Sequence, residues 1–129
     1  MKNLTISELK YLLTIDEGEG KLRMIDIAKI NHISKPSVLQ AITGLEKKGY
    51  VAKEETIRMT DEGTAILSEY KTIVGWLKTH LSVHCGVPVE IAYEDAVKCA
   101  CCFCDVSRKN IVKFVEEVPK VANLKKYKA

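Results

Sequence analysis

Hydrophobic residues recur every three to four positions along much of the chain, the period of an amphipathic helix. Residues 5–16 show this period first, and the glycines of EGEG at 17–20 end the segment. A short second helix is expected over RMIDIAKIN, and a third runs from about Lys35 to Lys48. YVAKEETIRMT instead contains two short runs around Glu54–Glu55, which predicts a small hairpin.

Three more helices are expected after the hairpin. Thr60 is a candidate N-cap for a helix through DEGTAILSEYKTIVGWLKTHL, which HCGVP interrupts. The next helix is expected over about 89–103, and the last from a cap at Ser107 to Pro119. The pattern predicts a mainly α fold, with a winged helix-turn-helix domain over 1–62 and a helical dimerisation and sensing domain over 63–129.

The third helix carries the signals of a DNA-recognition helix. Ser34 is a strong N-cap candidate, and Pro36 lies in the first turn, where a helix tolerates proline. With one face buried, the outer face presents side chains that can reach base edges or phosphates in the major groove. Basic residues of the hairpin add phosphate contacts. The candidate DNA-binding residues are Ser34, Lys35, Pro36, Ser37, Gln40, Thr43, Lys53 and Arg58.

Composition and charge fit this picture without deciding it. The chain has 129 residues, of which 47% are hydrophobic and 29% charged, as in a folded soluble domain. Its net charge of +3 permits a nucleic-acid partner. No apolar run is long enough to span a membrane, and the first residues lack the core of a signal peptide. A cytoplasmic protein is therefore expected, with its five cysteines reduced.

Residues 1–77 resemble the DtxR/MntR family of metal-dependent transcriptional repressors. The similarity rests on ELKYLLTI, DIAKINHISKPSVLQAITGLEKKGYV and MTDEGTAI, and continues more weakly through HCGVPVEIAYEDA. It implies that Ser34, Pro36, Ser37 and Gln40 approach DNA. It also implies a helical second half that makes a homodimer and holds iron or manganese. The chain is similar to the short members, which lack a C-terminal barrel.

The metal ligands that this resemblance implies are mostly replaced here. The ligand positions of the first helix fall on Lys10 and Leu13, and those of the helix after the hairpin on Tyr70 and Val74. The positions of the later helix fall on Val97, Ala100 and Cys101. Manganese and iron(II) prefer carboxylate and imidazole ligands. The sequence therefore predicts that the family's usual site is absent.

Four of the five cysteines lie in CACCFC, residues 99–104. An unbroken helix separates the pairs 99/102 and 101/104 onto different sides, so it does not gather all four sulfurs. If the helix ends near Phe103, then Cys101, Cys102 and Cys104 converge, and Cys85 or His84 adds a ligand. The expected metal ligands are Cys101, Cys102, Cys104, Cys99 and Cys85, for zinc, iron or an iron–sulfur cluster. Thiol redox sensing is the second interpretation, and packing as small hydrophobes is the third.

The expected function is a homodimeric regulator, a repressor, that binds double-stranded DNA and senses a soft metal or redox state through its cysteines. Two alternatives keep the winged helix for other purposes. One is a thiol or metal-trafficking protein, and the other is an adaptor for protein interactions. The sequence has no Ser/His/Asp arrangement or carboxylate pair, so an enzyme is not expected.

Overall fold

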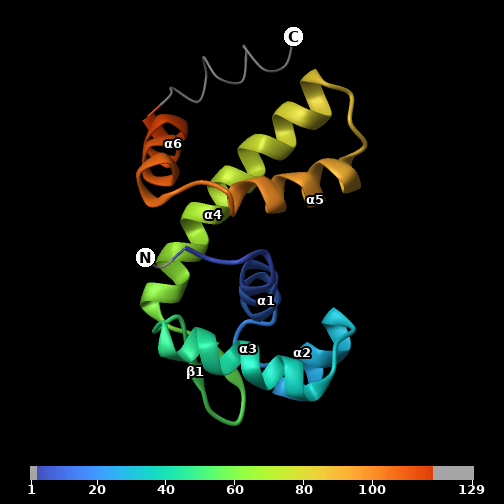
Figure 1. Ribbon diagram of the computed structural model, residues 1–129, viewed down its shortest axis with the longest axis vertical. Helices are drawn as coiled ribbons and strands as arrows, with labels where there is room; N and C mark the ends of the chain where they lie inside the picture. The colour runs from blue at the N-terminus through green and yellow to red at the C-terminus, as the bar shows by residue number, and fades with distance from the viewer. Residues whose placement is uncertain (1–2, 118–129) are drawn as a thin grey trace. The chain divides into compact units, whose positions relative to one another are not determined.

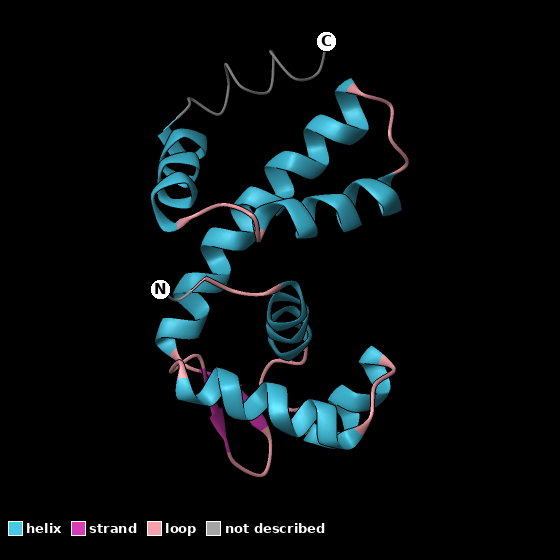
Figure 2. Cartoon of the chain, in the orientation of Figure 1, coloured by secondary structure: helices cyan, strands magenta, loops and turns pink. Residues whose placement is uncertain are grey.

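The computed structural model describes residues 3–117 of the chain (Figure 1). Helices make up most of the described residues, with one small two-stranded sheet among them (Figure 2). This confirms the mainly α, winged-helix fold class. The elements are α1 (Ile6–Glu17), α2 (Met24–Asn31), α3 (Lys35–Lys47), β1 (Val51–Lys53), β2 (Ile57–Met59), α4 (Asp61–Thr79), the π-helical η1 (His80–His84), α5 (Val89–Ala100) and α6 (Asp105–Glu117).

Local capping explains where α1 begins. The Thr5 side chain accepts from the backbone N–H of Glu8 at 3.1 Å, and the Glu8 carboxylate accepts from the backbone N–H of Thr5 at 2.9 Å. This capping box satisfies two N–H groups that the first turn leaves without helical partners. The inner face of α1 then packs into the core of the N-terminal half. The core residues there include Leu9, Leu12, Ile15, Ile27, Ile42, Leu45 and Ile57.

The hairpin is antiparallel, with Ala52 opposite Arg58. Its second strand is held from outside the hairpin, because the backbone N–H of Ile57 donates to the carbonyl of Leu22 at 2.8 Å. Ile57 is buried, so this strand is fixed by both a hydrogen bond and core packing. The hairpin therefore has the place and support of a wing.

The start of α4 is tied to the chain that enters the hairpin. Thr60 caps the helix as expected, since its hydroxyl accepts from the backbone N–H of Gly63 at 3.0 Å. The same hydroxyl donates to the carbonyl of Gly49. Gly63 lies directly against the carbonyl of Tyr50, where a Cβ atom would overlap the oxygen. Only glycine fits this close approach without a shift of the backbone.

The chain divides into two compact units inside α4, one comprising Lys2–Ser68 and the other Glu69–Ala129. The division lies a few residues beyond the boundary at 62/63 that the sequence predicts. In α4 the buried hydrophobic side chains are those of Leu67, Tyr70, Ile73 and Val74. Ala65, in the second turn of α4, is exposed. Across residues 3–117, the structure contains no helix with both the length and the apolar character needed to cross a bilayer.

The C-terminal helices differ from the expected bounds. Helix α5 ends at Ala100 rather than near 103, and α6 begins at Asp105. The carbonyl of Cys104 accepts from the backbone N–H of Arg108 at 2.9 Å, so Cys104 rather than Ser107 is the N-cap of α6. The predicted end at Pro119 lies outside the described residues.

Candidate nucleic-acid interface

The N-terminal turn of α3 is built around two serines. The Ser34 hydroxyl accepts from the backbone N–H of Ser37 at 3.4 Å, and donates to the Ser37 hydroxyl at 2.9 Å. His32 precedes this cap in the left-handed region, with φ 55°. The tight turn from α2 into α3 therefore ends on a helix N-terminus whose backbone N–H groups and dipole favour an anion.

The predicted DNA-binding residues of α3 are solvent-accessible along one face. Ser34, Lys35, Pro36, Ser37 and Gln40 are exposed, while Thr43 is half-buried. Val38, Ile42 and Leu45 are fully buried on the opposite face. The helix is thus anchored by its apolar side and presents a short row of polar groups outward, beginning at its capped end.

The wing carries mixed charge. Lys53 and Arg58 are exposed, as the sequence predicts for phosphate contacts, but Glu54 and Glu55 at the tip are exposed too. Arg58 also lines a surface depression together with Asp16 and Glu19. The basic groups available to a phosphate therefore lie on the strands of the wing rather than at its tip.

Two further polar residues lie beside α3 that the sequence analysis did not select. Lys29 and His32 line one concave surface together with Lys35. Both lie in or just after α2, on the side of the turn that leads into Ser34. Lys29 lies in the last turn of α2, where a cation complements the helix dipole, and His32 is the C-cap of α2. The sequence signal for both residues was their place at the end of this short helix, directly before the capped helix α3. Leu39, also on α3, is 45% exposed.

The positions that the DtxR/MntR resemblance assigns to metal ligands are mostly core residues. Tyr70, Val74, Val97 and Ala100 are buried. The Tyr70 hydroxyl accepts from Nη1 of Arg108 at 3.3 Å. An arginine at this place adds positive charge and a cation–π contact with the Tyr70 ring at 5.0 Å. These side chains provide packing and a buried cation, and they offer no ligand set for a hard metal.

The cysteines lie at and beyond the end of α5. Cys99, Cys102, Cys104 and Cys85 are exposed, and Cys101 is half-buried. None of the five, which all fall within residues 3–117, forms a disulfide. The described residues contain no group of three or more His, Cys, Asp or Glu side chains placed to hold a metal ion. The structure of the single chain therefore does not bring Cys101, Cys102 and Cys104 together as a metal site.

Cys104 stands out among the thiols. It is the N-cap of α6 through its carbonyl, and its thiol donates to the Ser107 hydroxyl, with Sγ and Oγ 3.6 Å apart. The surroundings lower the pKa of the Cys104 thiol, with the backbone N–H of Ser107 as the largest cause and the Ser107 hydroxyl as the next. A thiolate at a helix N-terminus is the nucleophilic form of cysteine.

Comparison with known proteins bears on the N-terminal half most directly. Residues 2–58 match the MarR family model. This stretch contains α1, the helix-turn-helix of α2 and α3, and nearly all of the wing. A search of curated proteins found no match.

Solved structures share the fold over most of the chain. The hypothetical protein SSo2273 from Sulfolobus solfataricus is 27% identical, with a TM-score of 0.63 over 87% of this chain and 89% of that one. The manganese regulator SloR is 20% identical, with a TM-score of 0.67 over 90% of this chain. IdeR of T. acidophilum is 19% identical, with a TM-score of 0.64 over 88%. The chain spans 55% of the length of each of these two regulators.

Proposed function

We propose that this protein is a DNA-binding transcriptional regulator that inserts α3 into the major groove. The observation that carries the proposal is the exposed row of Lys35, Ser37 and Gln40 on a helix whose capped N-terminus is open to solvent. Gln40 offers both a donor and an acceptor, which suits paired hydrogen bonds to adenine. The match of residues 2–58 to the MarR family supports this function.

Phosphate contacts come from the flanks of α3. Lys29 on one side and Lys53 and Arg58 on the wing supply cations that position the helix without reading sequence, and His32 lies beside Lys29 as a further polar group. The acidic tip of the wing, Glu54 and Glu55, is repelled by phosphates, so the tip stays outside the DNA backbone. The proposed contact surface is therefore α3, the preceding turn and the strands of the wing.

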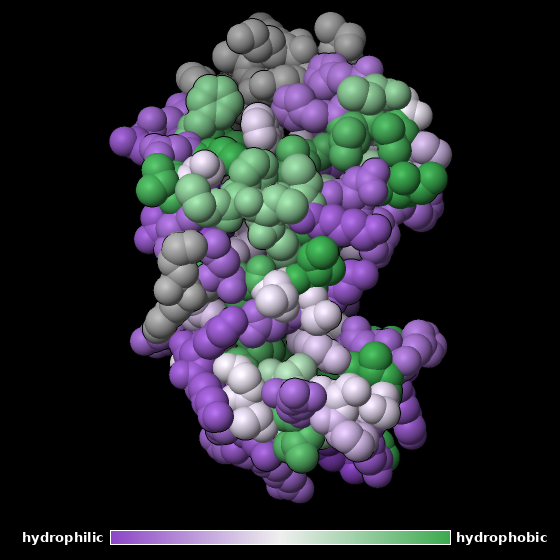
Figure 3. All heavy atoms as spheres, viewed as in Figure 1, coloured by the Kyte–Doolittle hydropathy of each residue, from purple (hydrophilic) through white to green (hydrophobic). Residues whose placement is uncertain are grey.

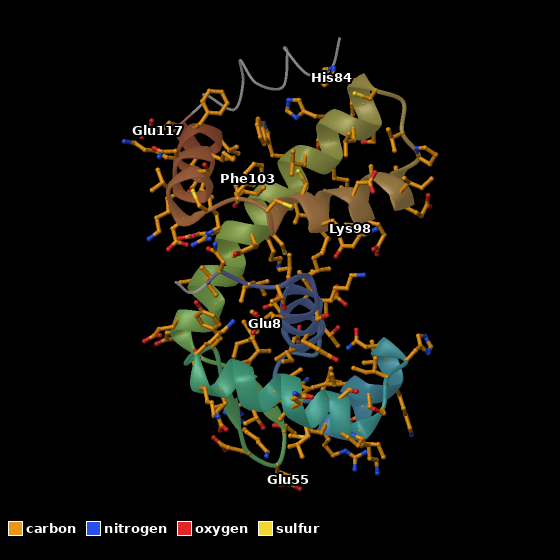
Figure 4. The ribbon with its side chains drawn as sticks, in the orientation of Figure 1. Glu8, Glu55, His84, Lys98, Phe103 and Glu117 are labelled. Carbon is orange, nitrogen blue, oxygen red and sulfur yellow. The ribbon has the colours of Figure 1, made fainter. Side chains whose placement is uncertain are left out.

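The regulator acts as a homodimer through its C-terminal unit. In that unit Val106 is 70% exposed and Phe114 54% exposed, and both line a groove with Trp76 and Phe103. Figure 3 shows apolar side chains at the surface in the region where Figure 4 labels Phe103. Exposed apolar patches of this kind mark interaction surfaces. A two-fold dimer brings two recognition helices to one DNA site and blocks it, which is the action of a repressor.

The cysteine cluster senses a soft metal or the redox state in the cytosol. Support comes from four thiols near one helix junction, of which Cys104 has a lowered pKa. Zinc, iron or an iron–sulfur cluster needs more ligands than the described part of one chain brings together. The proposed sensing is therefore either redox chemistry of the thiols or binding of a metal that takes further ligands from a second copy of the chain. This proposal extends the resemblance to the DtxR/MntR family, with thiols in place of its hard ligands. No enzymatic step is part of it.

Selection of binding sites from random duplex DNA tests the function. The full chain should enrich a palindrome with half-sites about one helical turn apart. Adding manganese(II) should not raise affinity for that site tenfold, because the positions of its ligands hold Lys10, Tyr70 and Val74. Enrichment without a palindrome would contradict the dimer. Absence of binding even at low salt would favour an adaptor for protein interactions.

A further inference from the structure

We propose that Leu39, on α3, reads the C5-methyl group of a thymine in the major groove of DNA. The inference rests on the proposed DNA-binding function and adds a base-reading residue to that interface. Leu39 is 45% exposed, although its helix buries three other aliphatic side chains. Apolar side chains recognise thymine methyl groups in the major groove, so a leucine on the outer side of this helix suits that contact.

Leu39 belongs to an apolar strip on the exposed side of α3. At 3.6 residues per turn, it lies about 60° from Pro36 and about 40° from Thr43 around the helix axis. Residues three and four positions apart are neighbours on the surface of a helix. Pro36 is exposed and Thr43 half-buried. The strip therefore consists of the proline ring, the leucine side chain and the threonine methyl group.

The apolar strip runs beside the polar group that the proposed function assigns to adenine. Gln40 is exposed and lies about 40° beyond Pro36, on the side away from Leu39. An adenine presents a donor and an acceptor in the major groove, and its partner thymine presents a methyl group in the same groove. A helix with an amide beside an apolar strip can therefore recognise both features of A·T pairs. The expected half-site contains such pairs at neighbouring positions.

The surface of α3 one turn beyond Gln40 is open. Gly44 has no side chain, and a Cβ atom there would meet nothing within 4 Å. Packing within the described residues therefore does not require a glycine at this place, where alanine would favour the helix more. Glycine does permit another molecule to approach the backbone closely. The open surface thus allows α3 to lie close to the bases, as contact with a methyl group requires.

The position of Leu39 distinguishes it from other exposed apolar side chains. Of the exposed large hydrophobic residues that the structure describes, only Leu39 lies on α3. Ile6, 39% exposed at the start of α1, is a suitable control. Oε1 of Glu8, two residues later, accepts from Nζ of Lys48 at 2.8 Å. Ile6 therefore lies near the C-terminal end of α3, at the opposite end from the capped first turn.

Replacing thymine by deoxyuridine tests the contact, because deoxyuridine pairs with adenine in the same way and lacks only the methyl group. In the site selected from random duplex DNA, each thymine is replaced in turn, and binding of the full chain is measured by fluorescence anisotropy. At one position of the half-site, the replacement should weaken binding about fourfold for each methyl group removed. Leu39→Ala should weaken binding to the thymine site at least as much. This variant should then bind the thymine and deoxyuridine sites equally, since the two changes remove the same contact.

Two further variants serve as controls. Leu39→Met keeps an apolar side chain of similar volume and should retain the dependence on the methyl group. Ile6→Ala should retain both the affinity and this dependence. Thermal unfolding checks that Leu39→Ala is folded, as expected for a good helix former at an exposed position.

The outcomes separate this inference from the proposed function. A parent that selects a DNA site but binds its thymine and deoxyuridine forms equally at every position overturns the role of Leu39 alone. A selected half-site without thymine does the same, as does a Leu39→Ala variant that keeps the full dependence on the methyl group. A parent that binds no duplex at low salt overturns both the inference and the proposed function.

Discussion

Nε of Arg108, in α6, donates to Oε1 of Glu69, in α4, at 3.0 Å, and the arginine side chain is only 2% exposed. Its Nη2 also donates to Asp105 at 2.6 Å. Burial works to lower the pKa of Arg108, but the hydrogen bonds to Glu69 and Asp105 outweigh it and raise that pKa further. A buried cation is thus held by two carboxylates and the Tyr70 ring.

Arg108→Ala should therefore destabilise the protein by about 2–3 kcal/mol, measured as the free energy of unfolding in urea. Removing the guanidinium takes away its hydrogen bonds and leaves a gap beside Tyr70. The loss stays moderate because Glu69 and Asp105 remain partly solvated. Arg23→Ala, at the exposed pair with Asp26, is the control and should cost less than about 0.5 kcal/mol. Equal effects of the two substitutions would show that Arg108 does not stabilise this unit.

Gly63→Ala should destabilise the fold by about 2 kcal/mol, because the new methyl group overlaps the carbonyl of Tyr50. Gly44 is the matched control, since a Cβ there meets nothing within 4 Å. Gly44→Ala should instead stabilise by about 0.5–1 kcal/mol through better helix propensity. Thermal unfolding of both variants checks the sign. A stabilised Gly63→Ala variant would contradict the close approach.

The parts of the fold that depend on local sequence were predictable. Ser34, Thr60 and the hairpin around Glu54–Glu55 were identified because caps and turns use short-range hydrogen bonds. The MarR match and the solved structures support a winged-helix fold but leave the DtxR/MntR resemblance a prediction.

The features that could not be predicted from the sequence depend on contacts between residues distant in sequence or on an unusual residue type. The sequence alone places Arg108 at the surface, because its hydrogen-bond partner Glu69 lies 39 residues away in the chain. Ser107 has the better capping propensity, yet the chain uses Cys104, a residue that capping preferences do not favour. Since the end of α5 was placed too late, the geometry of the thiols could not be worked out from helix periodicity.

Gln40→Ala should cost about 1–3 kcal/mol at a selected DNA site and relax the preference for the base that Gln40 contacts. Lys53→Ala should weaken binding to all DNA sequences alike. It should also reduce the slope of the logarithm of the binding constant against the logarithm of the salt concentration by about one. Lys109→Ala, an exposed lysine in the other unit, is the charge-matched control. Fluorescence anisotropy over a salt series measures all three. Unchanged sequence preference in Gln40→Ala would remove this residue from the interface.

Val106→Lys should weaken self-association about tenfold or more, roughly 1.4 kcal/mol, by placing a charge in the apolar groove. Val106 is 70% exposed in the single chain, so the substitution should leave the fold intact. Ile30→Lys introduces the same charge at a 53% exposed residue of the other unit and should not affect assembly. Sedimentation equilibrium measures both. A dimer that tolerates Val106→Lys uses a different surface.

Cys104 should react with iodoacetamide at a lower pH than free cysteine, because Ser107 lowers the pKa of the Cys104 thiol. Only the thiolate reacts, so the rate for Cys104 should fall off at a pH below the ordinary thiol value of about 8.5. A variant that keeps Cys104 as its single cysteine allows the comparison. In the Cys104 variant, Ser107→Ala should move the midpoint upward. Coincident pH profiles would contradict the hydrogen bonding.

The same lowered pKa has a consequence for folding. When the pKa of a thiol is lower in the folded than in the unfolded protein, ionisation of that thiol stabilises the fold. This stabilisation is fully present above the pKa of the thiol in the unfolded protein, and it is lost as the pH falls through the pKa of the thiol in the folded protein. Cys104→Ser should therefore flatten the dependence of unfolding free energy on pH between these two values.

Helices are usually capped by Ser, Thr, Asp or Asn, whose side chains do not undergo the oxidation reactions of a thiol. The N-cap of α6 is a cysteine instead, and its sulfur lies 3.6 Å from the Ser107 hydroxyl in the first turn. Alkylation, oxidation or capture by a metal each removes the S–H that donates to the Ser107 hydroxyl. The helix that carries the buried Arg108 thus begins at a surface atom whose chemical state can change.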